Sequence, residues 1–240
     1  MNKAIILAAG NSSRLQKYLK GGPKQLIKIN QLTIIEHLVN KLKKLNIKKI
    51  VLVTGFQSKK IKKVLKQKVR YIFYPNFKIT NNLHTLLHVK DELNQSLLCL
   101  FSDVIFDLEI LRKLKDSKKD ICLAVDKKSR LNGTMRIKTK KNYVVDIGNQ
   151  IKTKQSSGNF IGFAKFSKKG CDNIKKNLVK YKFSNYRDYY TFALKGLMKN
   201  NKVYFEDFSG YYWKEIDTYK DLIEAKKINN EIEKKEKEKI

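Results

Sequence analysis

Three short stretches of the sequence carry side chains that suit phosphate and metal chemistry. The first is LAAGNSSR at residues 7–14, which is followed by Lys24. Its small residues let backbone N–H groups approach a ligand closely, and Arg14 and Lys24 bring fixed positive charge to the same place. The segment matches neither the dinucleotide-binding glycine fingerprint nor the P-loop motif. It indicates a polyphosphate site, although a glycine loop without a ligand explains it equally well when it is considered alone.

The other two stretches each end in an aspartate that follows apolar residues. Asp103 comes after LLCLFS, and Asp217 closes the run WKEID. A carboxylate at the mouth of a buried strand costs free energy unless a cation or hydrogen bonds compensate it. Mg²⁺ is commonly held by one or two carboxylates together with substrate phosphates, so Asp103 and Asp217 are predicted magnesium ligands. Each of them, considered alone, also fits a helix N-cap.

Strands that alternate with helices in the first half of the chain would position these residues. Such alternation is typical of a doubly wound parallel sheet, which binds ligands at the carboxyl ends of its strands. Apolar runs predict strands at 4–9, 49–54, 69–74 and 97–101. Helical spacing predicts helices at 33–45 and 83–93, and a further helix that ends with Val64 and Leu65.

The second half changes character, because short strands are separated by turn signals such as Asn132-Gly133. An antiparallel extension of the sheet is therefore expected. The strands are predicted at 120–126, 134–139, 143–147, 160–166, 203–205 and 213–216, and the helices at 167–179, 188–200 and 219–239. The expected fold class is α/β, with a Rossmann-like, doubly wound, mixed and mostly parallel sheet in one continuous domain over residues 1–240.

The charge balance is strongly basic, with 53 lysines and arginines against 22 acidic residues and a formal net charge of +31. Only six of the basic residues are arginines, and the lysines are spread along the chain. Because arginine is the usual choice for bidentate phosphate and base contacts, nucleic-acid binding is a distant alternative. The three cysteines agree with a reducing cytoplasm, and no apolar run approaches the ~20 residues of a membrane span.

Taken together, the pattern LAAG-x3-R, the later PK-x-L and the aspartate after a central strand resemble the nucleotidyltransferases that make nucleoside-diphosphate sugars and alcohols. Three further stretches, at 74–93, 102–107 and 213–227, are similar to the cytidylyltransferases that use phosphocholine or 2-aminoethylphosphonate. The TNN-x2-[ST]-L pattern that begins at Thr80 is the most discriminating of them. The resemblance implies a GT-A-like fold, with a nucleotide-binding half at 1–118, a substrate-binding half at 119–218 and a C-terminal helix at 219–240.

The resemblance also implies roles for individual residues. It assigns Arg14, Lys24 and Asp103 to catalysis, Asp103 and Asp217 to Mg²⁺, and the following residues to the nucleotide: Leu7, Ala8, Gly10, Thr80, Asn81 and Ser102. The chain departs from many sugar-nucleotide members at Gly158-Asn159, where those members have Gly-Glu and the glutamate serves a sugar hydroxyl. This difference weakens a sugar phosphate as the substrate.

The acceptor pocket is expected around the segment SGYYWKEID, which directly precedes and includes Asp217. Aromatic faces attract quaternary ammonium groups, so Tyr189, Tyr212 and Trp213 suit choline. A primary amine would instead need a carboxylate, for which Glu215 or Asp188 is a candidate. Filling of the core explains any single aromatic residue equally well.

The expected reaction is Mg²⁺-dependent transfer of a cytidylyl group from CTP to a small phosphorylated amino-alcohol or phosphonate, with release of pyrophosphate. The alternative is activation of a sugar 1-phosphate with UTP or dTTP. No general base is required, because the attacking phosphate is already an anion. We expect no nucleic-acid or membrane partner, and a homodimer is left open.

Overall fold

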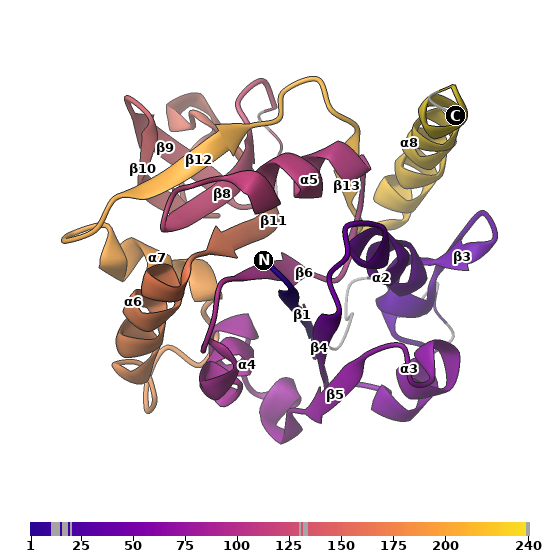
Figure 1. Cartoon of the computed structure of the whole chain (residues 1–240), viewed down its shortest axis with the longest axis horizontal. Coiled ribbons are helices and arrows are strands. Elements are labelled where there is room, and N and C mark those ends of the chain that lie inside the picture. Colours follow the sequence, from indigo (N-terminus) through magenta and orange to yellow (C-terminus); the bar gives the residue numbers. More distant parts are fainter. Residues whose placement is uncertain (11–14, 16–18, 20, 130, 132–133, 239–240) are drawn as a thin grey trace.

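The computed structural model describes residues 1–10, 15, 19, 21–129, 131 and 134–238, and its centre is a nine-stranded mixed sheet (Figure 1). The strands are, in order across the sheet, β5 (Arg70–Phe73), β4 (Lys49–Thr54), β1 (Lys3–Ala8), β6 (Leu97–Phe101), β11 (Gly158–Phe166), β8 (Ile121–Asp126), β12 (Val203–Asp207), β10 (Tyr143–Gly148) and β9 (Arg136–Lys140).

The direction of the strands changes at the middle of the sheet. β5, β4, β1 and β6 are mutually parallel. β11 then runs antiparallel to both of its neighbours, β12 is parallel to β8, and β10 is antiparallel to β12 and β9. The expected fold class is confirmed: a parallel, doubly wound half carries an antiparallel extension.

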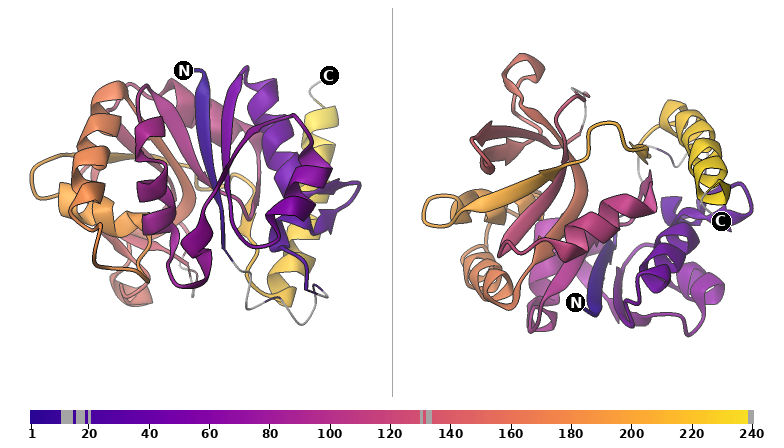
Figure 2. Two further views of the ribbon diagram at one scale, coloured as in Figure 1. Left: turned by 90° about the horizontal axis from the view of Figure 1, so that it is seen from below. Right: turned by 45° about the horizontal axis from the view of Figure 1, so that its top comes forward.

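Helices cover both faces of the sheet (Figure 2). On one side lie α2 (Ile34–Lys44), α3 (Ser58–Leu65) and α5 (Leu108–Asp116), and on the other lie α4 (Asn82–His88), α6 (Lys168–Val179) and α7 (Tyr190–Leu197). Local sequence determines where α2 begins, because Thr33 and Glu36 form a capping box there. The apolar residues that follow face the sheet. None of the described helices is both long enough and apolar enough to cross a membrane.

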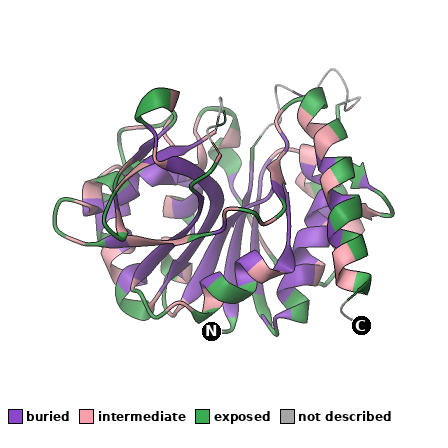
Figure 3. Ribbon diagram, turned by 90° about the horizontal axis from the view of Figure 1, so that it is seen from above, coloured by how far each residue is buried: buried purple, intermediate pink, exposed green. Residues whose placement is uncertain are grey.

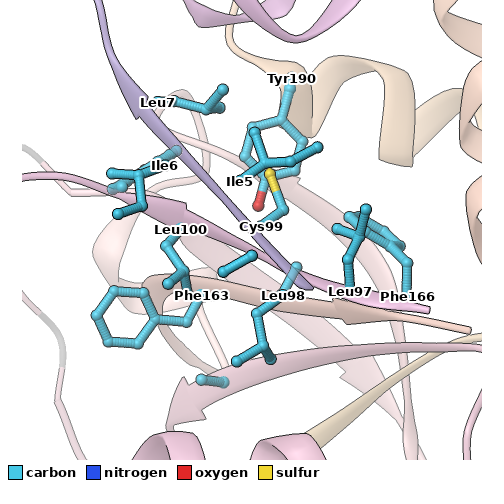
Figure 4. Close-up of a cluster of buried hydrophobic side chains, with 14 of the residues drawn as sticks. Ile5, Ile6, Leu7, Leu97, Leu98, Cys99, Leu100, Phe163, Phe166 and Tyr190 are labelled. Carbon is cyan, nitrogen blue, oxygen red and sulfur yellow. The ribbon is translucent and has the colours of Figure 1, made fainter. Parts of the chain in front are cut away.

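The core lies between the sheet and these helices, where β1, β6, β8 and β11 are buried along their whole length (Figure 3). The central strands are apolar on both faces, as parallel strands covered by helices must be. Side chains of β1 and β6 pack with Phe163 and Phe166 of β11 and with Tyr190 of α7 (Figure 4). This rigid base holds the carboxyl ends of β1 and β6, and therefore the segments that follow them.

Several short elements were not predicted. They are the hairpin strands β2 (Lys28–Ile29) and β3 (Leu32–Thr33), the strand β7 (Val104–Phe106), the helix α5, and the 3-10 turns η2 (Lys24–Leu26), η3 (Pro75–Lys78), η4 (Lys90–Glu92) and η5 (Thr153–Gln155). β7 pairs with β13 (Trp213–Glu215) in a separate two-stranded sheet, with Glu215 opposite Val104. α8 (Tyr219–Lys237) begins directly afterwards and packs on both strands. The pairing of β7 with β13 brings the segment before α8 to the end of β6.

Candidate active site

Three carboxylates meet at the carboxyl end of β6. Asp103 follows β6, Glu215 ends β13, and Asp217 lies two residues further on. One oxygen from each can be chosen so that all three lie within 4.8 Å of one another. A backbone hydrogen bond fixes the approach of the two segments, since the Ile216 N–H donates to the Asp103 carbonyl at 2.9 Å.

Lys24 lies between two of these carboxylates. Its ammonium forms an ion pair with Asp103 Oδ2, contacts Asp217 Oδ1 at 2.9 Å, and donates to the Ile216 carbonyl at 3.3 Å. Burial by itself would lower the pKa of Lys24, but the charges of Asp103 and Asp217 outweigh burial and raise this pKa well above its usual range. Lys24 therefore remains a cation at physiological pH.

A cavity of about 330 Å³ opens beside these groups. From the first half of the chain it is lined by Leu7, Ala9, Gly10, Leu15, Lys24, Gln25, Phe77, Lys78, Thr80, Asn81, Asn82, Thr85, Phe101, Ser102 and Asp103. From the second half it is lined by Thr134, Met135, Arg187, Tyr189, Glu215 and Asp217. Most of the residues assigned from sequence thus share one cavity. Ala8 does not line it, because its side chain is buried within β1.

The side-chain oxygens in this cavity suit the coordination of a hard divalent cation. Among the described residues, Asp103 Oδ1 and Gln25 Oε1 are buried oxygens without a hydrogen-bond partner. Buried polar atoms are normally paired, so two such oxygens beside a carboxylate cluster indicate that a ligand completes the site. Carboxylate and amide oxygens are also the protein ligands that Mg²⁺ takes.

Two aromatic residues assigned to the acceptor are placed elsewhere. Trp213 is buried, and its Nε1 donates to Asp126 Oδ2 at 3.0 Å at the end of β8. Tyr212 is 38% exposed, and its ring lies 6.0 Å from the ammonium of Lys235 on α8. Neither is among the residues that line the cavity, so the structure does not bring Tyr212 and Trp213 together with Tyr189 there.

Tyr189 and Glu215 do line the cavity, whereas the other candidate carboxylate, Asp188, accepts a hydrogen bond from Asn185 and lies outside it. Glu215 was assigned to the acceptor, and the structure also places one of its carboxylate oxygens within 4.8 Å of the two predicted metal ligands. Arg14 falls outside the described residues.

Sequence reasoning missed Gln25 and Arg187. Gln25 Nε2 donates to Ser102 Oγ at 3.1 Å, which fixes a side chain beside Asp103. Arg187 reaches the cavity because its segment is bonded to the start of α4: the Asn81 N–H donates to the Tyr186 carbonyl at 2.7 Å, and Asn81 Nδ2 donates to the Arg187 carbonyl at 3.2 Å. The PK-x-L motif could have pointed to Gln25, but no local signal marks Arg187.

Comparisons with known proteins show the family of this chain. The family model described as a MobA-like NTP transferase domain matches residues 4–165. The chain belongs to this family. It is a nucleotidyltransferase, which confirms the resemblance drawn from the motifs.

Individual relatives differ in substrate. The chain is 28% identical over 183 residues to the CTP:phosphoglutamine cytidylyltransferase of Campylobacter jejuni, a match that covers 68% of this chain and 72% of the relative. It is 27% identical over 244 residues to the bifunctional protein GlmU of Methanocaldococcus jannaschii, covering 99% of this chain but 58% of that longer relative. The structure of the inositol-1-phosphate CTP transferase from T. maritima superposes with a TM-score of 0.82 at 20% identity, over 97% of this chain and 96% of the other. This last likeness shows that the two share a fold.

Proposed function

We propose that this nucleotidyltransferase couples CTP to a small phosphorylated acceptor and releases pyrophosphate. The observation that carries the proposal is the position of Lys24 between Asp103 and Asp217, beside a cavity at the carboxyl ends of β1 and β6. A cation flanked by two potential metal ligands suits a reaction in which two phosphate groups must meet.

The reaction balances without a covalent intermediate. An oxygen of the acceptor phosphate or phosphonate forms a bond to the α-phosphorus of CTP, and the bond from that phosphorus to the oxygen bridging to the β-phosphate breaks. The electron pair leaves with pyrophosphate. Because the nucleophile is already an anion, no side chain has to remove a proton, and catalysis depends on positioning and charge.

The residues of the cavity divide this work. Lys24 supplies a permanent positive charge where the two anions approach each other. Asp103 and Asp217 would hold Mg²⁺, which when bound neutralises charge on the phosphates. Leu7, Gly10 and Asn81 border the part of the cavity that would receive the nucleoside.

The acceptor is proposed to carry an ammonium group. Glu215 lines the cavity as a member of the carboxylate cluster and offers a hydrogen-bond acceptor for N–H donors, and Tyr189 lines the same cavity. Since Tyr212 and Trp213 lie elsewhere, a primary ammonium is favoured over trimethylammonium, which would need several ring faces. The phosphoglutamine relative, whose acceptor is also phosphorylated, supports this class of substrate.

A second candidate is activation of a sugar 1-phosphate with UTP or dTTP. Its support is that a putative glucose-1-phosphate thymidylyltransferase from Bacillus anthracis shares the fold, with a TM-score of 0.78 at 19% identity. The asparagine at position 159 argues against it, because the glutamate of many sugar-nucleotide members is missing.

A matrix of nucleotides and acceptors tests both candidates. The four NTPs are combined with 2-aminoethylphosphonate, phosphocholine, phosphoglutamine and glucose 1-phosphate, and pyrophosphate release is measured with and without MgCl₂. We expect turnover with CTP and an amino-bearing acceptor, lost without Mg²⁺. Turnover only with UTP or dTTP and glucose 1-phosphate would establish the second candidate instead.

A further inference from the structure

Asn159 stands where many sugar-nucleotide members have an acceptor-binding glutamate, yet it does not face the cavity. Its side chain is completely buried, and it is not among the residues that line the cavity. Asn159 Oδ1 accepts a hydrogen bond from the Leu131 N–H at 3.0 Å, and its Nδ2 donates to the Thr134 hydroxyl and to the Leu131 carbonyl. Among the residues that the structure describes, the hydrogen bonds of this side chain are all with the segment that follows β8.

That segment forms part of the cavity wall. Thr134 and Met135, here called the acceptor wall, line the same cavity as Glu215 and Asp217. β11 also holds the wall through the main chain, since the Phe160 N–H donates to the Met135 carbonyl at 2.8 Å. Asn159 thus lies behind the acceptor wall, and the substrate space lies in front of it.

A second buried polar side chain strengthens the attachment. Arg136 is buried and donates from its guanidinium to the Leu131 carbonyl at 3.0 Å and to the carbonyls of Ile151 and Asn149. The Leu131 main chain is therefore bonded from Asn159 and from Arg136. Several hydrogen bonds from two buried side chains thus hold the Leu131 main chain in one arrangement.

The neighbouring Gly158 has a steric reason to be glycine that does not involve a substrate. A Cβ at this position would lie 2.5 Å from the Asp126 carbonyl oxygen. The Gly-Asn pair therefore fits a role in packing the start of β11 against the end of β8.

The residue type at position 159 suits this role. An asparagine accepts with one atom and donates with the other, as the Leu131 N–H and the Thr134 hydroxyl require. A glutamate is longer and charged, and a carboxylate in a completely buried position costs free energy unless it is paired. On the basis of the proposed function, we propose that Asn159 is a positioning residue that sets acceptor selectivity by fixing the acceptor wall, without touching the acceptor.

Two substitutions test this from both ends of one hydrogen bond. Asn159→Asp removes the donor to Thr134, and Thr134→Val removes the hydroxyl while leaving the buried asparagine intact. We expect each to raise KM for the accepted phospho-acceptor about tenfold, with KM for CTP changed less than twofold. Hydrogen–deuterium exchange of the peptide spanning 131–135 should become faster in both variants. Asn142→Asp, in the exposed turn between β9 and β10, is the matched control and should match the unmodified protein in all three measurements.

The outcomes separate this inference from the proposed function. Three outcomes would overturn the inference about Asn159. They are faster hydrogen–deuterium exchange with an unchanged KM for the acceptor, equal rises in KM for the acceptor and for CTP, and unchanged exchange in both variants. A folded Asn159→Glu variant that gains turnover with glucose 1-phosphate would also overturn it, because position 159 would then touch the acceptor. If CTP gives no pyrophosphate with any acceptor, the proposed function fails. The two variants are then compared by their KM values for whichever nucleotide and acceptor do release pyrophosphate.

Discussion

Asp103 is the residue that connects the sheet most directly to the proposed chemistry. It follows β6, pairs with Lys24 and keeps one buried oxygen without a partner among the described residues. Asp103→Asn keeps the size of the side chain but removes one negative charge. We expect kcat to fall about 100- to 1,000-fold, as removal of several kcal/mol of charge stabilisation implies. Pyrophosphate release measures the loss, and a thermal melt checks the fold.

The matched control is Asp116→Asn, an exposed aspartate at the end of α5. Its turnover should stay within twofold of the unmodified enzyme, because it is remote from the cavity. Near-normal activity of the Asp103 variant would show that Asp103 is not a ligand of the catalytic metal.

Substitution of Lys24 should lower turnover but raise the affinity for a metal ion. Its ammonium occupies Asp103 Oδ2 and Asp217 Oδ1, which are the atoms proposed to bind the metal. Lys24→Met should therefore lose turnover and yet bind Mn²⁺ about tenfold more tightly in the absence of nucleotide, a gain of about 1.4 kcal/mol. Electron paramagnetic resonance titration with Mn²⁺ measures the affinity. Lys78→Met, at another lysine of the cavity, should leave it unchanged, and weaker Mn²⁺ binding by Lys24→Met would contradict the competition.

At the scale of elements, Trp213 joins β13 to the end of β8. Asp126 is buried and accepts from the indole N–H, from Ser129 and from main-chain N–H groups. Burial would raise the pKa of Asp126, but these hydrogen bonds lower it below its usual value. Trp213→Phe leaves this carboxylate with one donor fewer and should reduce the free energy of unfolding by about 1–3 kcal/mol, measured by urea denaturation. A raised acceptor KM with unchanged stability would instead support an acceptor role for Trp213.

The first turn of α8 holds Asp217 in place and should do so in a pH-dependent way. Asp221 accepts hydrogen bonds from the N–H groups of Asp217 and Thr218, and it pairs with Lys214. Burial would raise the pKa of Asp221, but Lys214 and Thr218 outweigh it and lower that pKa. A folded-state pKa below the unfolded one means that the stabilisation is present above about pH 4 and is lost as the pH falls through the folded-state pKa.

Asp221→Asn should therefore lower the free energy of unfolding at pH 7 by about 1–2 kcal/mol. The difference from the unmodified protein should shrink below about pH 4, as measured by urea titration at several pH values. A difference that grows on acidification would show that the carboxylate of Asp221 is not the stabilising group.

Sequence patterns predicted most of the longer elements and missed most of the shortest ones, together with the nine-residue helix α5. β4 was predicted at its exact bounds and β6 likewise, because fully buried strands are continuous apolar runs. β7 has three residues, too few for any periodicity, and its partner β13 lies more than a hundred positions away. The motifs indicated Lys24, Asp103 and Asp217, but Tyr212 and Trp213 were placed by their proximity in sequence. Which face of β13 meets the cavity depends on that long-range pairing, so the sequence alone could not exclude them.

At the scale of the whole molecule, the net charge of +31 should govern how substrates arrive. A strong positive potential raises the local concentration of a nucleoside triphosphate, and salt screens it. We expect KM for CTP to rise about tenfold between about 20 and 300 mM NaCl, and KM for a zwitterionic acceptor to rise much less. Steady-state kinetics at constant free Mg²⁺ measures both. Equal salt effects on the two substrates would show that the charge does not steer the nucleotide.

The carboxylate cluster described above is assembled from distant parts of the chain, and this has a consequence for the order of folding. Lys24 and Asp217 are 193 positions apart, and Asp103 joins them only when β7 pairs with β13. Contacts of such long range are slow to form, because closing a long loop costs chain entropy before any stabilising contact has formed. In refolding from denaturant, secondary structure of the β1–β4 half should therefore recover before catalytic activity, and the return of turnover would time the completion of the native topology.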